Sequence, residues 1–128
     1  LDSQLSRRSL NAACVKYKIP LVTGAAVKDR GQVFTVIPGE SSCYNCVYGP
    51  SNAETLSMEA CNTQGINPSV LSIIASMQVS ETIDIIVGNK PQLLNKILFF
   101  ILDGFNFIKT ETFRNKECDV CRFPIYGV

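Results

Sequence analysis

Two cysteine pairs place the tightest limit on what this chain can fold into. Cys43 and Cys46 form one C-x-x-C pair, Cys118 and Cys121 form another, and 71 residues separate the pairs. A C-x-x-C turn directs two sulfurs toward one metal ion, and two such turns supply the four thiolates of a closed tetrahedral zinc site. Because the pairs are so far apart, a zinc ion held by them would join two distant parts of one fold.

Disulfide bonds in a secreted protein are the alternative use of the same cysteines. The sequence does not start with a signal peptide, and its hydrophobic content of 46% is enough for an ordinary core. We therefore favour structural zinc, with free thiols and a cytoplasmic location. The first residue is not Met, so we expect a processed chain or part of a longer protein.

Composition excludes several functional classes. The 128 residues include no histidine, so they cannot supply a Ser-His-Asp triad, a Cys-His dyad or an H-E-x-x-H site. A net charge of +1 gives no general attraction for nucleic acid or an anionic membrane. The longest apolar stretches, residues 70–87 and 97–108, are interrupted by acidic side chains. We therefore expect no membrane span, no membrane partner and no nucleic-acid partner.

Hydrophobic periodicity and turn residues predict an α/β fold with a mixed sheet. The expected elements are a helix over residues 6–18, strands over 21–27 and 31–37, a long polar excursion over 41–68, a helix over 68–87, and a hairpin of strands over 97–103 and 107–113. Motifs that cradle nucleotide phosphates, G-x-G-x-x-G and G-x-x-x-x-G-K-[ST], do not occur.

The pattern of apolar residues also predicts which faces are buried. The expected apolar face of the first helix consists of Leu10, Ala13, Cys14 and Tyr17, with Cys14 as a small buried hydrophobe. The second helix is apolar over most of its circumference, which predicts a core helix. The first strand should be buried on both faces, and the alternation of the last strand predicts an antiparallel hairpin with one partly solvated face.

A series of short motifs runs from Asp2 almost to Cys121. They are Asp2 with Arg7, Leu10-Asn11-Ala12-Ala13-Cys14, Ile19-Pro20-Leu21-Val22 with Gly24-Ala25-Ala26, Gly31-Gln32-Val33, Pro38-Gly39-Glu40 before the first cysteine pair, Cys61 with Gly65, Ser76 with Gln78, and Arg114-Asn115 before the second pair. Each motif alone is weak, but their joint order and spacing are specific. In these features the sequence resembles the C-terminal half of the MoeB/ThiF/HesA family, the ubiquitin-activating-enzyme-like adenylyltransferases.

The resemblance implies both a fold and a function. Residues 1–128 would be the C-terminal part of one Rossmann-like ThiF-type adenylation domain. Enzymes of this family bind ATP and Mg²⁺ and activate the C-terminal Gly-Gly carboxylate of a ubiquitin-like or sulfur-carrier protein as an acyl adenylate. Sulfur transfer toward molybdopterin, thiamine or thiolated tRNA often follows.

By the same resemblance, Asp2 is the catalytic carboxylate that holds Mg–ATP, and Cys61 is the reactive cysteine. The four-cysteine cluster matches the structural zinc site of the family. A carboxylate is a hard ligand suited to Mg²⁺. For Cys61, a structural or incidental role is the alternative, because no Lys or Arg beside it in the sequence would lower the pKa of its thiol.

The resemblance also puts the nucleotide-binding half of the enzyme upstream of Asp2, outside this sequence. We therefore expect these residues alone to bind ATP poorly and to work with the N-terminal half of the same enzyme and a ubiquitin-like partner. The apolar stretches suggest a homodimer interface or a surface covered by the missing half. The alternative function is a catalytically inactive, zinc-stapled module that only binds the ubiquitin-like partner.

Overall fold

The computed structural model describes residues 1, 3–50 and 65–122. Four strands form one sheet in the order β1-β2-β3-β4: β1 (Leu21–Val27), β2 (Arg30–Val36), β3 (Lys96–Ile101) and β4 (Asn106–Glu111). All three neighbouring pairs are antiparallel. The mixed sheet expected from the sequence is therefore wrong for the described residues, where parallel pairing occurs only as two isolated bridges, Lys28 with Ile66 and Thr35 with Leu94.

The path between β2 and β3 explains why these strands are antiparallel. The chain leaves β2 at Val36 and rejoins the sheet at the opposite end, where Ile66 bridges Lys28. Helix α4 (Pro68–Val87) then leads back to the first end, where Leu94 bridges Thr35. Since β3 starts beside the end of β2, it must run in the opposite direction.

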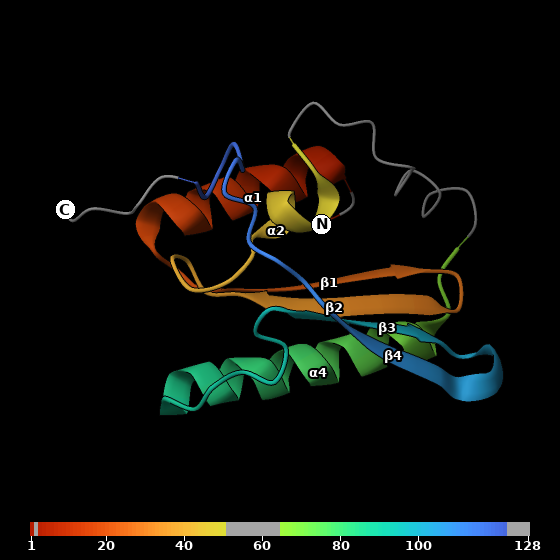
Figure 1. Ribbon diagram of the computed structural model, residues 1–128. Coiled ribbons are helices and arrows are strands. Elements are labelled where there is room, and N and C mark those ends of the chain that lie inside the picture. Colours follow the sequence, from red (N-terminus) through yellow and green to blue (C-terminus); the bar gives the residue numbers. More distant parts are fainter. Residues whose placement is uncertain (2, 51–64, 123–128) are drawn as a thin grey trace.

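Helices cover the two faces of the sheet (Figure 1). Helices α1 (Gln4–Tyr17) and α2 (Tyr44–Tyr48) lie on one face together with residues 112–122, and α4 lies on the other face. Each face has its own buried cluster. The cluster on the α1 side contains Val15, Phe34, Val36, Cys43, Tyr44, Ile97, Cys118 and Cys121. The cluster on the α4 side contains Ala26, Val33, Val70, Ile74, Leu93 and Phe100.

Helix α1 buries a different face from the one that the periodicity predicts. Its buried residues are Arg7, Arg8, Asn11, Cys14 and Val15, whereas Leu10 and Tyr17 are exposed. The polar side chains are buried because they satisfy backbone groups of neighbouring segments. Arg7 donates to the Gly24 carbonyl at 2.8 Å, and Arg8 donates to the Gly49 carbonyl at 2.8 Å. The prediction that Cys14 is a small buried residue is confirmed, and burial raises the pKa of its thiol.

Helix α4 has the bounds that the sequence predicts, because both ends are capped. The Asn67 side chain accepts a hydrogen bond from the Ser69 N–H at 2.9 Å, and Pro68 occupies the first turn. Gly88 ends the helix in the left-handed conformation at φ 82°. The predicted burial is wrong, since α4 packs through one face only. Its exposed large apolar side chains are Leu71, Val79, Ile83, Ile86 and Val87.

The exposed apolar face also changes the membrane expectation. Judged by length and composition alone, α4 could cross a membrane: its mean hydropathy is 1.6, and 17% of that apolar stretch is buried. Its other face packs against β1 and β2 and carries the buried acidic residue Glu81. The packing of that face, rather than the composition of the helix, identifies α4 as one layer of the fold.

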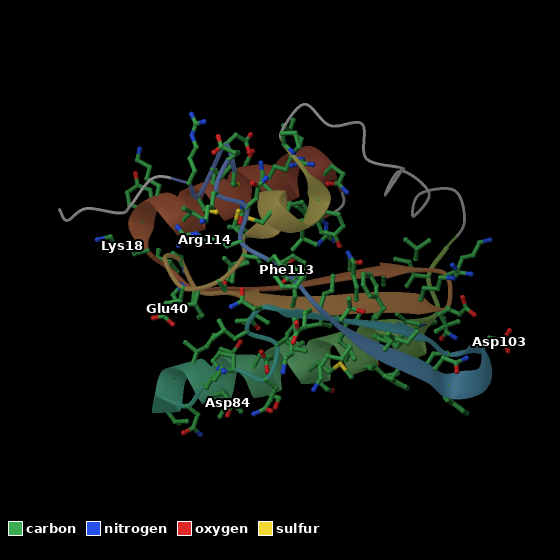
Figure 2. All side chains as sticks on the ribbon, viewed as in Figure 1. Lys18, Glu40, Asp84, Asp103, Phe113 and Arg114 are labelled. Carbon is green, nitrogen blue, oxygen red and sulfur yellow. The ribbon has the colours of Figure 1, made fainter. Side chains whose placement is uncertain are left out.

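The predicted C-terminal hairpin is confirmed, with Asp103 at its turn (Figure 2). Strand β4 differs from the expectation in burial, because all six of its residues are exposed rather than those of one face. It forms the edge of the sheet, and the ring of Phe107 stacks on that of Phe100 with centroids 5.3 Å apart. Strand β1 is likewise an edge strand, and most of it is half-buried rather than buried on both faces.

Candidate metal centre

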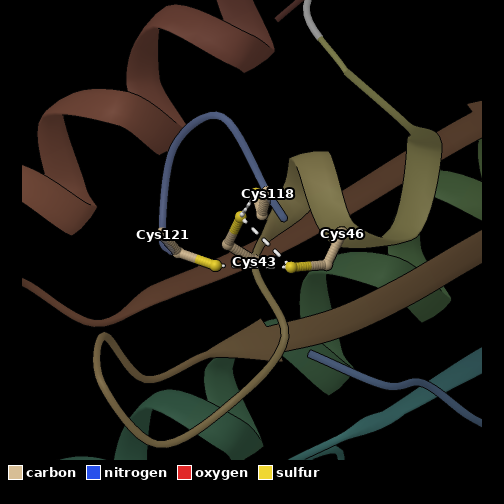
Figure 3. Close-up of side chains that lie close together, drawn as sticks. All are labelled: Cys43, Cys46, Cys118 and Cys121. Atoms are coloured by element: carbon tan, nitrogen blue, oxygen red, sulfur yellow. Dashed lines mark hydrogen bonds between the residues drawn. The ribbon is translucent and has the colours of Figure 1, made fainter. Parts of the chain in front are cut away.

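The four paired cysteines converge on one point (Figure 3). Their Sγ atoms all lie within 4.8 Å of one another, with 3.8 Å between Cys43 and Cys46, 3.6 Å between Cys43 and Cys118, and 3.3 Å between Cys46 and Cys121. With Zn–S bonds of about 2.3 Å, a regular tetrahedron has edges of about 3.8 Å. The spacing therefore suits one tetrahedral ion, and it is too long for S–S bonds of about 2.05 Å.

The first cysteine pair is positioned by the chain segment that follows β2. Cys43 is the residue before α2, and the Val47 N–H donates to the Cys43 carbonyl at 3.2 Å, which closes the turn between the two sulfurs. The preceding residue, Ser42, donates its backbone N–H to Asn95 Oδ1 at 2.9 Å. Asn95 adopts a left-handed conformation at φ 55°, and its carbonyl accepts the Thr112 N–H at 2.9 Å. Asn95 therefore connects the start of the first pair with the end of β4.

The second pair is positioned by the segment that follows β4. The Arg114 guanidinium donates to the Cys121 carbonyl at 2.7 Å and to the Gly39 carbonyl at 3.0 Å. It thereby attaches the C-terminal turn to the loop that precedes the first pair. Cys43, Cys118 and Cys121 are buried, and Cys46 is half-buried. Phe34 of β2 and Tyr44 of α2 belong to the same buried cluster as Cys43, Cys118 and Cys121.

Backbone donors also point at the sulfurs. The Asn115 N–H donates to Cys46 Sγ at 3.4 Å, and the Val120 N–H donates to Cys118 Sγ at 3.5 Å. Such donors stabilise the negative charge of a thiolate, which is the form that binds a metal. Val120 lies between the two cysteines of the second pair, and Asn115 lies just before that pair. The segment that carries the second pair of ligands therefore also carries the donors.

The thiols of the cluster share protons when no metal is bound. A hydrogen bond from the Cys43 thiol lowers the pKa of Cys46 to about 4, and the same bond raises the pKa of Cys43 above its ordinary value. Burial raises the pKa of Cys121 to about 11. A bound divalent cation removes these differences in protonation, because coordination replaces the protons of all bound thiols.

The donor set fits a structural zinc ion. Four sulfur ligands leave no position for substrate or water, so the site would be closed and non-catalytic. None of the described cysteines, Cys14 included, takes part in a disulfide. The predicted clustering of the four cysteines is therefore confirmed. Metal binding is the chemistry that four converging thiols can perform.

Comparison with known proteins agrees with this geometry. The model of the ThiF family matches residues 1–121. The chain belongs to the ThiF family. Among curated relatives within the family, the molybdopterin-synthase adenylyltransferase of Escherichia coli strain K12 is 33% identical over 122 residues, which cover 94% of this chain and 47% of that protein. The adenylyltransferase and sulfurtransferase MOCS3 of Drosophila persimilis is 34% identical over 122 residues, covering 94% of this chain and 27% of the relative. The chain thus spans less than half the length of these relatives.

Solved structures of ThiF-like fold resemble the model over nearly its whole length. The structure of the E. coli enzyme MccB with ATP has a TM-score of 0.76 and 22% identity, covering 96% of this chain and 38% of MccB. The microcin C7 biosynthetic enzyme MccB in complex with N-formylated MccA has a TM-score of 0.77 and 19% identity, covering 94% of this chain and 39% of the other. At these identities the likeness concerns the fold. It confirms a ThiF-type α/β arrangement.

Both residues expected to act in catalysis, Asp2 and Cys61, lie outside the described residues. Arg7 donates to the Leu1 carbonyl at 2.8 Å as well as to the Gly24 carbonyl, so it links Leu1 to β1. A cavity of about 370 Å³ lies here, lined in part by Leu1, Arg7 and Gln78.

Sequence reasoning found the cysteine ligands but missed the side chains that support them. Asn11, Asn45, Asn95 and Arg114 all donate to or accept from backbone or side-chain groups next to the cluster. Asn11, Asn45 and Arg114 belong to the motifs that carry the family resemblance, but those motifs assign them no contact with the cluster. No spacing rule signals a structural asparagine, because its partners lie far away in the sequence.

Proposed function

We propose that this chain is the C-terminal part of an adenylyltransferase that activates the C-terminal Gly-Gly carboxylate of a ubiquitin-like or sulfur-carrier protein. The observation that carries the proposal is the similarity of 33% identity over 122 residues to a molybdopterin-synthase adenylyltransferase. MccB, which shares the fold, has been solved in complex with ATP, which fits a nucleotide-dependent reaction. The four-cysteine cluster serves this enzyme as a structural zinc site.

The proposed reaction is a nucleotidyl transfer. A carboxylate oxygen of the carrier attacks the α-phosphorus of ATP, a new P–O bond forms, the bond between the α- and β-phosphates breaks, and pyrophosphate leaves. Asp2 would hold the Mg²⁺ that offsets the charge of the triphosphate, and Arg7 holds the carbonyl of the preceding residue, Leu1. ATP binding further requires the N-terminal half of the enzyme. Cys61 acts after adenylation, as the thiol that takes part in transfer.

The exposed apolar face of α4 supports the proposed assembly. Its outward side chains, among them Ile83 and Ile86, form a contact for either a second copy in a homodimer or the N-terminal half of the enzyme. We assign the enzyme to the cytoplasm, where thiols stay reduced and available to zinc. Sulfur transfer toward molybdopterin is the pathway favoured by the curated relatives, ahead of thiamine or tRNA thiolation.

ATP–pyrophosphate exchange by the full-length protein tests the proposal. We expect exchange in the presence of a sulfur-carrier protein that ends in Gly-Gly, and none with the same carrier lacking those two residues. Asp2→Ala should reduce exchange at least about a hundredfold, which is about 2.7 kcal/mol in barrier height. Cys61→Ala should leave exchange nearly unchanged and reduce transfer. Carrier binding without any exchange would favour the inactive docking module instead.

A further inference from the structure

A chain of hydrogen bonds connects the interiors of the two C-x-x-C turns. Asn45 lies between Cys43 and Cys46, and Asp119 lies between Cys118 and Cys121. The Asn45 amide Nδ2 donates to Asp119 Oδ1 at 3.0 Å, although the two residues are 74 positions apart. Asn45 is buried, with 3% of its surface exposed, so its amide is held among fixed neighbours.

The direction of this chain is fixed by its first donor. The backbone N–H of Tyr44 can only donate, and it donates to Asn11 Oδ1 at 3.0 Å. Asn11 Nδ2 then faces Asn45 Oδ1 at 3.4 Å, which turns the Asn45 amide nitrogen toward Asp119. Asn11, on α1, is fully buried. Each amide therefore has one orientation, and the carboxylate at the end is the acceptor.

These bonds involve no sulfur, so they leave all four sulfurs available to the metal. The bond between Asn45 and Asp119 sets the distance between the two turns. Arg114 holds the end of the second turn through the Cys121 carbonyl. Asp119 also lies beside a ligand, with 4.0 Å between its Oδ1 and Cys118 Sγ. A contact that fixes both turns reduces the conformational freedom that metal binding would otherwise have to remove.

We propose that Asn45 is a positioning residue of the metal centre, and that its bond to Asp119 sets the affinity of the four cysteines for zinc. Groups that orient metal ligands typically change affinity about 10–100-fold when removed. The inference concerns metal binding alone, so it stands or falls separately from the adenylation proposed above.

Zinc affinity of the whole protein tests the proposal. Zn²⁺ is titrated against a chromophoric chelator at fixed pH for the wild type, Asn45→Ala, Asp119→Ala and the double variant, and Co²⁺ absorption reports the coordination geometry. We expect each single variant to bind Zn²⁺ at least about tenfold more weakly. The double variant should be no weaker than the weaker single variant, because both changes remove the same bond.

Asn106→Ala is the matched control. Asn106 is an exposed asparagine whose amide bonds to a nearby carbonyl in the C-terminal hairpin, and its removal should leave zinc affinity unchanged. If Asn45→Ala does not fold, Asp119→Ala decides, because Asp119 is exposed and its loss leaves no cavity. Zinc affinity of Asp119→Ala within twofold of wild type would overturn the proposal. Additive losses in the double variant, or no Zn²⁺ binding by the wild type, would overturn it too.

Discussion

At the scale of single residues, buried polar groups rather than apolar ones fix how the elements meet. Glu81 is a carboxylate with 3% of its surface exposed, and it accepts hydrogen bonds from Thr35 Oγ1 at 2.6 Å, Gln92 N at 2.7 Å and Leu93 N at 3.0 Å. It joins α4 to β2 and to the loop that leads into β3. Burial of this acidic side chain is tolerated here because three donors replace its water.

Replacement of Glu81 should be strongly destabilising. Glu81→Ala leaves the backbone N–H groups of Gln92 and Leu93 and the Thr35 hydroxyl without this acceptor, and we expect the free energy of unfolding to fall by about 3 kcal/mol. Thr35→Val removes a single one of these bonds and should cost about 1 kcal/mol. Urea unfolding at constant zinc concentration measures both. A loss below about 1 kcal/mol for Glu81→Ala would contradict this account of the carboxylate.

The cysteine protons predict how metal affinity depends on pH. The pKa of Cys43 is raised by its bond to Cys46, and burial raises that of Cys121 to about 11, so both thiols hold protons between pH 6 and pH 8. Zinc binding must release these protons, whereas Cys46, with a pKa of about 4, has already lost its own. Apparent zinc affinity should therefore rise at least about a hundredfold per pH unit. Competition titrations across this range would refute the two-proton release if the slope stayed below tenfold per unit.

At the scale of elements, local signals predicted lengths well and burial poorly. Helix α4 has its predicted bounds, and the structure shows why: the caps Asn67 and Gly88 act on the backbone next to them. The exposed sides of α4 and β4 were not predictable, because hydrophobicity does not say whether a partner is present. The buried face of α1 was mispredicted for a related reason. Arg7 and Arg8 can be buried because they donate to carbonyls that lie 17 and 41 positions away in the sequence.

The close approach of α4 to the sheet depends on two glycines in neighbouring strands. A Cβ atom on Gly24 would lie 2.4 Å from Ile74 Cγ2, and one on Gly31 would lie 2.3 Å from Phe100 Cζ. Both distances are shorter than van der Waals contact allows. The helix and the β3 aromatic ring therefore pack directly on backbone at these positions.

Gly31→Ala should consequently overpack the cluster on the α4 side. We expect a loss of about 1–3 kcal/mol in the free energy of unfolding, because Phe100 is buried and its ring also stacks on Phe107. Addition of Phe100→Leu to this variant should recover part of the loss by making room for the new methyl group. Thermal denaturation of the three proteins tests this, and no recovery in the double variant would argue against the clash with Phe100.

At the scale of the whole molecule, the two faces of the sheet are stabilised in different ways. The cluster on the α4 side is made of ordinary apolar side chains, while the cluster on the α1 side includes three of the cysteine ligands. The sequence predicted the ligands because a C-x-x-C turn is a local pattern with one main use. The supporting amides were not predictable, since their geometry exists only after distant segments have met.

Removal of the metal should therefore affect one face more than the other. After treatment with EDTA, we expect the backbone amides of Asn115 and Val120 to lose protection from hydrogen exchange, because both donate to ligand sulfurs. Amides paired between β2 and β3 should stay protected, and the thermal midpoint should fall by at least about 5 °C. Cys121→Ser should behave like the chelated protein, whereas Cys14→Ala should keep its zinc. Uniform protection with and without metal would show that zinc does not hold this face together.

The separation of the cysteine pairs also sets the timing of assembly during biosynthesis. The sheet grows outward from β1 in chain order, so its strands can pair as they leave the ribosome. Cys121 is 75 positions beyond Cys46, which corresponds to about 4–15 s of translation at typical rates. Until Cys121 has been synthesised, the first pair supplies only two of the four ligands. A chain that ends before the second pair cannot complete the site. Tight metal retention thus requires that translation has passed Cys121.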